Sequence, residues 1–157
     1  MKNMSEKSES VVLKASSLKE EGNVAFKKGS LKEALDLYVR ALEVVDEYGC
    51  HDEEETLPDS IRSLLASILS NMSLVSRKLG DTRTAITSAR RGASLQPHSL
   101  KLAGRLADAY VSIGLDEKAK AILQKSIEAK DISDTDKPVI PELRRRLAIL
   151  KERETER

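Results

Sequence analysis

The sequence predicts an all-α protein in which helical hairpins stack side by side as an α-solenoid. Small residues recur at fixed intervals, and aromatic residues make up only 3% of the chain. No segment shows the alternating apolar pattern of a strand, which aromatic and β-branched residues would favour. With 157 residues, the chain is long enough for one domain of ordinary size.

The repeat is visible in four columns of small residues that share two spacings. The first spacing is 51 residues, as from Gly29 to Gly80, and the second is 34, as from Gly80 to Gly114. The columns are Gly29, Gly80 and Gly114; Ala34, Ala85 and Ala119; Gly22, Ser73 and Ala107; and Ala41, Gly92 and Ser126. A small residue at a helix crossing lets two backbones approach closely. The pattern predicts a 34-residue unit repeated three times, with about 17 extra residues after the first copy.

Each unit is interpreted as two antiparallel helices joined by a glycine turn. The expected helices span residues 15–28, 31–46, 58–79, 82–95, 98–113 and 116–129. The three repeats then occupy residues 15–48, 66–99 and 100–130, with a loop and helix extension at residues 49–65.

The two ends of the chain differ from the repeats. Residues 1–14 are polar and are expected to be a disordered or partly ordered segment. Residues 131–157 are expected to form a linker and a capping helix that Pro141 opens. Its stripe of Leu143, Leu147 and Leu150 would cover the last apolar face of the array.

Composition argues against several classes of function. A net charge of +1 argues against a bulk electrostatic role on nucleic acid or an anionic membrane. A single cysteine, Cys50, excludes an intramolecular disulfide, and with His51 it stands beside acidic residues that indicate a loop rather than a zinc site. No run of apolar residues is long enough for a membrane helix or a secretion signal. We therefore expect a cytoplasmic protein without metal or cofactor.

Catalytic motifs are also missing from the sequence. It contains no glycine-rich phosphate loop, no nucleophile elbow and no acid–base pair in a familiar frame. An enzyme is therefore not expected.

The 34-residue unit resembles the tetratricopeptide repeat (TPR). The likeness rests on small residues at its eighth, twentieth and twenty-seventh positions and on Pro97 at the thirty-second. It covers about residues 15–129 and the capping helix, although Leu18, Leu69 and Ala103 replace the large aromatic residue usual at the fourth position. The resemblance implies three TPR helix-turn-helix repeats in a right-handed superhelical α-solenoid, with the first helix of each repeat lining a concave groove.

The first helices also match one subset of this family, the carboxylate-clamp domains of co-chaperones. The five matching positions are Lys19, Asn23, Asn71, Lys101 and Arg105. The chain holds only three asparagines, and two of them stand at these positions. The resemblance implies that Lys19, Asn23 and Asn71 bind the terminal carboxylates of a peptide. Lys101 and Arg105 would then bind its side-chain carboxylate and upstream backbone.

The chemistry suits these residue types at these spacings. Carboxylates are bound best by charge-assisted donors, and residues four apart project from one face of a helix. Each basic pair taken alone indicates only a solvated helix face, so the argument depends on all five in register. Two further candidates are Lys78, for an upstream acidic side chain, and Phe26, which either lines an apolar pocket or belongs to the core.

The resemblance implies a co-chaperone-type interaction module. Its partner would be the C-terminal Glu-Glu-Val-Asp tail of heat-shock protein 90 and/or heat-shock protein 70, and we expect a monomer that binds neither nucleic acid nor membrane. One alternative is a chaperone-independent TPR scaffold that binds an internal peptide or helix. A second is a repeat protein that reads RNA through Lys101, Arg105 and the run 144–146, which the neutral charge and scarce aromatic residues disfavour.

Overall fold

The computed structural model describes residues 3–48 and 57–156, which form seven α-helices and one short 3-10 helix with no strand among them. The α-helices are α1 (Met4–Lys27), α2 (Leu31–Tyr48), α3 (Asp59–Lys78), α4 (Thr82–Leu95), α5 (Leu100–Ser112), α6 (Asp116–Ile127) and α7 (Ile140–Thr155). The all-α prediction is confirmed. The expected extension at 49–65 is described only from residue 57, and Cys50 and His51 lie outside the described residues.

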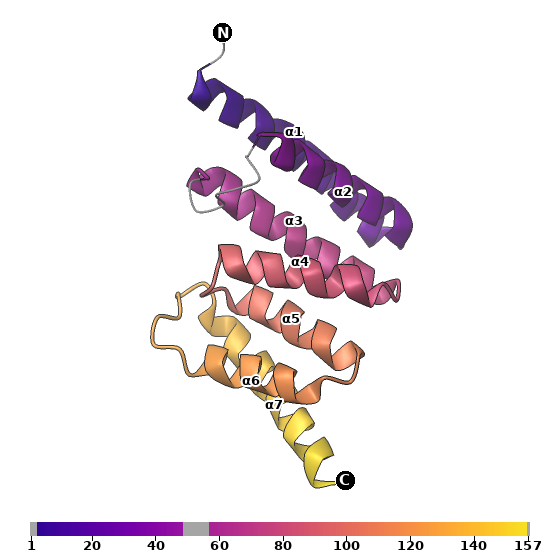
Figure 1. Ribbon diagram of the computed structural model, residues 1–157, viewed down its shortest axis with the longest axis vertical. Coiled ribbons are helices and arrows are strands. Elements are labelled where there is room, and N and C mark those ends of the chain that lie inside the picture. Colours follow the sequence, from indigo (N-terminus) through magenta and orange to yellow (C-terminus); the bar gives the residue numbers. More distant parts are fainter. Residues whose placement is uncertain (1–2, 49–56, 157) are drawn as a thin grey trace.

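Three antiparallel hairpins stack in chain order, followed by α7 (Figure 1). They consist of α1 with α2, α3 with α4, and α5 with α6. The first helices of successive hairpins also contact each other, α1 with α3 and α3 with α5. Side chains from all three first helices can therefore meet on one side of the stack.

The same glycine turn closes each hairpin. Gly29, Gly80 and Gly114 have φ angles of 81°, 81° and 78°, which a residue with a Cβ adopts only under strain. In the first turn the Ser30 amide donates to the Ala25 carbonyl over 2.9 Å, and the other two turns repeat this bond at 2.9 Å. This Schellman-type cap ends the first helix and starts the second at the same point of every repeat.

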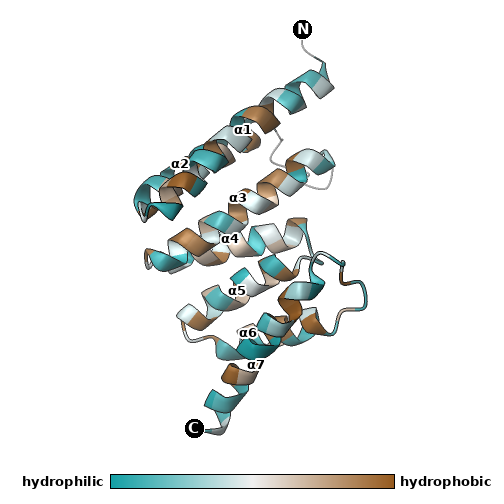
Figure 2. Cartoon of the chain, turned by 180° about the vertical axis from the view of Figure 1, so that it is seen from behind, coloured by the Kyte–Doolittle hydropathy of each residue, from teal (hydrophilic) through white to brown (hydrophobic). Residues whose placement is uncertain are grey.

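Outside the three turn glycines, small residues of the repeat columns are packed where helices cross. Ala34, Ala85 and Ala119 are completely buried. A Cβ placed on Gly22 would come within 2.6 Å of Tyr38 Cε1, which is closer than two such atoms can approach. Figure 2 shows hydrophobic residues interspersed with hydrophilic ones along the helices, the pattern of helices that bury one face.

The expectation for residues 1–14 needs a correction, because α1 begins at Met4 and residues 4–14 are helical. A capping box starts the helix: the Glu6 amide donates to Asn3 Oδ1 at 2.8 Å, and the Asn3 amide donates to Glu6 Oε2 at 3.3 Å. Val11 and Val12 pack against the core of the first two hairpins, so this part of α1 is held by tertiary contacts.

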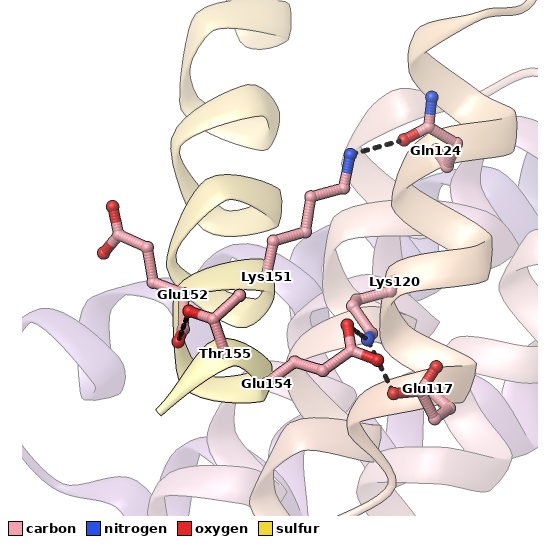
Figure 3. A network of polar contacts seen from close by, with 7 residues as sticks. All are labelled: Glu117, Lys120, Gln124, Lys151, Glu152, Glu154 and Thr155. Atoms are coloured by element: carbon pink, nitrogen blue, oxygen red, sulfur yellow. Dashed lines mark hydrogen bonds and ion pairs between the residues drawn. The ribbon is translucent and has the colours of Figure 1, made fainter. Parts of the chain in front are cut away.

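The capping helix α7 closes the other end of the stack. Leu143, Leu147 and Leu150 are buried against the last hairpin. Figure 3 shows the polar contacts between α6 and the end of α7, where Lys120 Nζ lies 2.6 Å from both Glu117 Oε1 and Glu154 Oε2. The apolar stripe and this network together fix which face of α7 points toward the hairpins.

Neither a membrane-spanning helix nor a cluster of metal-ligating side chains occurs in residues 3–48 and 57–156. No helix there has the length and apolar character needed to cross a membrane. Nor does any group of three or more metal-ligating side chains come together in that part of the chain.

The first prediction tests the crossing at Gly22. We expect Gly22→Ala to lower the free energy of unfolding by about 1–3 kcal/mol, because the new methyl group would force the Tyr38 ring to move. Ser17→Ala, at an exposed position of the same helix, is the control and should change stability little. Urea unfolding followed by circular dichroism measures both, and equal stability of the two variants would contradict the close approach.

Candidate functional site

Two asparagines from different hairpins meet at the centre of the candidate site. Asn71 Nδ2, on α3, donates to Asn23 Oδ1, on α1, at 3.1 Å. The Tyr38 hydroxyl, on α2, donates to the same oxygen at 2.6 Å. Both amide side chains are half-buried, so this arrangement joins the first two hairpins at the side where their first helices face each other.

These bonds fix the orientation of the Asn23 amide. Because its oxygen accepts two hydrogen bonds, the opposite end of the group, Nδ2, is turned away from Tyr38 and Asn71. That nitrogen donates to no described residue. Asn23 therefore holds two N–H donors in a set direction, and Asn71 keeps one further N–H of its own.

The third hairpin adds two cations to this position. Lys101 and Arg105 stand four residues apart on α5. Arg105 Nε donates to the Ser70 hydroxyl at 3.4 Å, and Ser70 directly precedes Asn71 on α3. Arg105 therefore lies next to the turn of α3 that carries Asn71.

Lys19 belongs to the same cluster of cations as Lys101 and Arg105, because its charge acts on Lys101. Burial lowers the pKa of Lys101, and the positive charges of Arg105 and Lys19 lower it further. Lys19 is on α1, so cations from the first and third hairpins are close enough to repel each other. Burial is likewise the main reason that the pKa of Arg105 is lowered.

Few negative charges balance these cations. Lys19 Nζ lies 3.9 Å from Glu20 Oε1, a long contact with a largely exposed carboxylate. Neither Lys101 nor Arg105 forms an ion pair with any residue in the described ranges. The site thus combines three cations with two oriented amides, and an anion with several oxygens would relieve the repulsion between the cations.

Within the described ranges, the two further candidates from the sequence, Phe26 and Lys78, form no hydrogen bond or ion pair with the five site residues, and their roles stay predictions. Phe26 is half-buried and packs against the core of the first two hairpins, so its contacts are those of a core residue. Lys78 is exposed at the end of α3. The cation of α3 that interacts with Arg105 is its neighbour Arg77, which is half-buried and lowers the pKa of Arg105.

Sequence reasoning missed Tyr38, Ser70 and Arg77 as neighbours of the site. Gly22 is a partial signal for Tyr38, since a glycine at a crossing leaves space for a large side chain on the facing helix. Ser70 and Arg77 are ordinary helix residues whose role depends on α5 lying alongside α3. No pattern within one repeat could indicate that contact.

Comparison with known proteins shows what this fold resembles. A tetratricopeptide-repeat family model matches residues 100–131. The C-terminal TPR-containing domain of a Plasmodium falciparum protein named as an FK506-binding protein superimposes with a TM-score of 0.74 at 25% identity, covering 99% of this chain and 95% of that one. The fold of the described residues is that of a tetratricopeptide-repeat domain, and residues 100–131 match the repeat family itself.

Two further proteins are similar. The first TPR of Spaghetti (RPAP3), described as bound to the HSP90 peptide SRMEEVD, has a TM-score of 0.60 at 21% identity over 87% of this chain and 94% of that one, which shows the shared fold. Peptidyl-prolyl cis-trans isomerase D of Cryptococcus neoformans is 33% identical over 133 residues, 78% of this chain. The chain spans only 26% and 36% of the length of two curated relatives that it matches.

The second prediction concerns the crowded cations. We expect Lys101→Gln to raise the free energy of unfolding by about 0.2–0.5 kcal/mol at neutral pH, the size of a like-charge pair four residues apart on a helix. Urea unfolding measures this change, and Lys125→Gln is the control because it removes an exposed cation from α6. The difference between the two variants then reports the effect of removing the charge at Lys101 in particular. A Lys101 variant no more stable than the control would contradict the repulsion.

The pH dependence of this difference has a defined sign. Because the pKa of Lys101 is lowered in the folded chain, the unfolded chain binds the proton of this ammonium group more tightly. Stability therefore rises as the pH rises from the lowered pKa of the folded chain to the ordinary pKa of the unfolded chain. The advantage of Lys101→Gln over the wild type should therefore shrink as the pH approaches the ordinary lysine pKa of about 10.4.

Proposed function

We propose that this tetratricopeptide-repeat domain binds the free C-terminal end of an acidic peptide by its carboxylates. The observation that carries the proposal is the meeting of Asn23 and Asn71 beside an excess of positive charge from Lys101 and Arg105. A peptide that ends in aspartate offers two carboxylates on one residue, the main-chain terminus and the side chain. Such a ligand matches both the donors and the charge of the site.

Each residue has a distinct role in this proposal. Asn23 and Asn71 donate their remaining N–H groups to the main-chain carboxylate, and Lys19 supplies charge from the neighbouring turn of α1. Lys101 and Arg105 bind the side-chain carboxylate and the backbone just before it. Tyr38 positions Asn23, and Ser70 positions Arg105.

Pre-organisation supports this assignment. All five donors are carried by helices, and the side chain of Asn23 is already held by two hydrogen bonds before any ligand arrives. Less conformational entropy is then lost when a peptide binds. The role is recognition alone, and it uses no cofactor and no catalytic step.

The ligand that we propose is the Glu-Glu-Val-Asp tail of heat-shock protein 90 and/or heat-shock protein 70. Two similar folds support this class of partner: one is described as bound to the HSP90 peptide SRMEEVD, and another is named the Hsp90 co-chaperone Cns1 of Saccharomyces cerevisiae. We expect binding on the scale of a dissociation constant of about 1 μM for such a small, polar contact. It should weaken with added salt, because exposed charges are screened.

The third prediction tests recognition of the carboxylate. Calorimetric titration with Met-Glu-Glu-Val-Asp should show binding of the free acid, and the C-terminal amide should bind about tenfold or more weakly, because it lacks one charged acceptor. The affinity of the Lys101→Gln variant for the free acid should fall by a similar factor, whereas Lys125→Gln should bind the free acid as tightly as the wild type.

The combination of results separates the proposal from a general loss of structure. Lys101→Gln should bind more weakly although it unfolds at higher urea concentration. Equal binding of acid and amide would reject the clamp and favour a scaffold that binds an internal peptide or helix.

A further inference from the structure

Tyr110 joins two cations that come from the second helices of neighbouring hairpins. α4, α5 and α6 follow one another in the stack (Figure 1), and Tyr110 lies on α5. Arg90 Nη2, on α4, donates to the Tyr110 hydroxyl at 3.0 Å. Lys118 Nζ, on α6, lies 5.6 Å from the centre of the Tyr110 ring, within the range of a cation–π contact. Because only 7% of the tyrosine is exposed, both cations rest against a fixed group.

The positive charge at this seam between α4 and α6 is largely uncompensated. Neither Arg90 nor Lys118 forms an ion pair with a carboxylate in residues 3–48 and 57–156. α4 contains no Asp or Glu. Asp116 and Glu117 begin α6, and Glu117 pairs at 2.6 Å with Lys120, whose ammonium group also binds α7. The seam is therefore a place where a ligand could supply the missing negative charge.

A third cation extends this surface along α4. Arg83 precedes Arg90 by seven residues, which is two helical turns, so both project from the same face of the helix. Both arginines are exposed, as are Lys118 and Thr87, which lies between the arginines on α4. Arg83 and Arg90 are about 10 Å apart along the helix axis. Arg83, Arg90 and Lys118 are named the second-helix cations below.

The second-helix cations occupy different elements from the candidate peptide site. All five residues of that site lie on the first helices α1, α3 and α5, whereas these cations lie on α4 and α6. A ligand of this surface therefore does not depend on the clamp.

The surroundings of these cations favour an acidic protein segment over other polyanions. Single-stranded nucleic acid is usually bound by aromatic side chains that stack on its bases, but α4 and α6 contain no aromatic residue and Tyr110 is buried. A helix that lies on a membrane has an exposed apolar face, and none of the exposed large hydrophobic residues belongs to α4 or α6. Carboxylates need only charged donors, which this surface provides.

We propose that Arg83, Arg90 and Lys118 bind an acidic segment of a partner protein across α4 and α6. An extended chain covers about 10 Å in three residues, so a run of about four Asp or Glu residues reaches from Arg83 to Arg90. Tyr110 positions Arg90, so that this side chain loses less conformational entropy on binding. The inference goes beyond the proposed function, because the segment needs no free C-terminus.

Calorimetric titration with hexaglutamate tests the proposal. The peptide is acetylated at its N-terminus and amidated at its C-terminus, which removes the terminal carboxylate that the clamp requires. The wild type should bind it at low salt, and the double variant Arg90→Gln/Lys118→Gln should bind about three- to tenfold more weakly, the range expected for two partly exposed ion pairs. No binding by the wild type would overturn the proposal.

The matched control removes the same charge elsewhere. Lys7→Gln/Lys14→Gln takes two exposed cations from α1 and should change hexaglutamate binding by less than about twofold. Equal losses in the two double variants would show a response to net charge alone and would overturn the proposal.

Tyr110→Phe tests the site without changing its charge. It removes the hydrogen bond that positions Arg90 and should weaken hexaglutamate binding about twofold or more, the size of one hydrogen bond. Circular dichroism checks that each variant is folded, and Tyr110→Phe decides if Arg90→Gln/Lys118→Gln is not. Unchanged affinity in Tyr110→Phe would contradict a site organised by this tyrosine.

Two further measurements identify the ligand class and separate this surface from the clamp. Hexauridylate and phosphatidylserine vesicles should bind more weakly than hexaglutamate, and tighter binding of either would overturn the choice of a protein segment. Saturating Met-Glu-Glu-Val-Asp should leave hexaglutamate binding unchanged, whereas competition would place hexaglutamate at the clamp and overturn the proposal. If the free acid and the amide of Met-Glu-Glu-Val-Asp bind equally, only the clamp is wrong.

Discussion

Tyr38 fills the space that the missing side chain of Gly22 leaves between α1 and α2, and its hydroxyl then reaches Asn23 in the next position of α1. One packing contact therefore sets two things: how closely the first hairpin closes, and where the amide of the candidate site points. Asn71 adds the second hairpin to this arrangement through the same oxygen. The polar site is consequently part of the packing between helices and cannot shift independently of it.

The cations beside these amides oppose the stability of the fold. Lys101 and Arg105 share one face of α5, both have lowered pKa values because they are partly buried, and no ion pair within the described chain offsets their charge. The nearby carboxylates Asp108 and Glu20 offset this charge only in part, because Asp108 pairs with Arg146 and Glu20 is largely exposed. Charge that is left largely uncompensated on rigid helices is expected where a ligand supplies the missing anion.

The sequence predicts the structural features that recur in every repeat, and it misses contacts that occur only once in the molecule. Gly29, Gly80 and Gly114 marked the hairpin turns because the positive φ of each cap requires glycine. Residues 4–14 were not expected to be fully helical, because their helix depends on a local capping box and on Val11 and Val12 meeting the core. The five candidate site positions came from the resemblance to the carboxylate-clamp repeats. The contact of Arg146 with α5 could not be predicted in this way, because Arg146 follows a linker that interrupts the 34-residue period.

The capping helix α7 also places a cation close to the candidate site. Arg146 lies between Leu143 and Leu147, so the burial of these leucines decides that its side chain turns toward α5. The positive charge of Arg146 lowers the pKa of Arg105, so undocking of α7 would remove one cation from the neighbourhood of the candidate site. The ion pair of Lys120 with Glu154 therefore also affects the candidate site, because contacts that hold the far end of α7 help to keep Arg146 over α5.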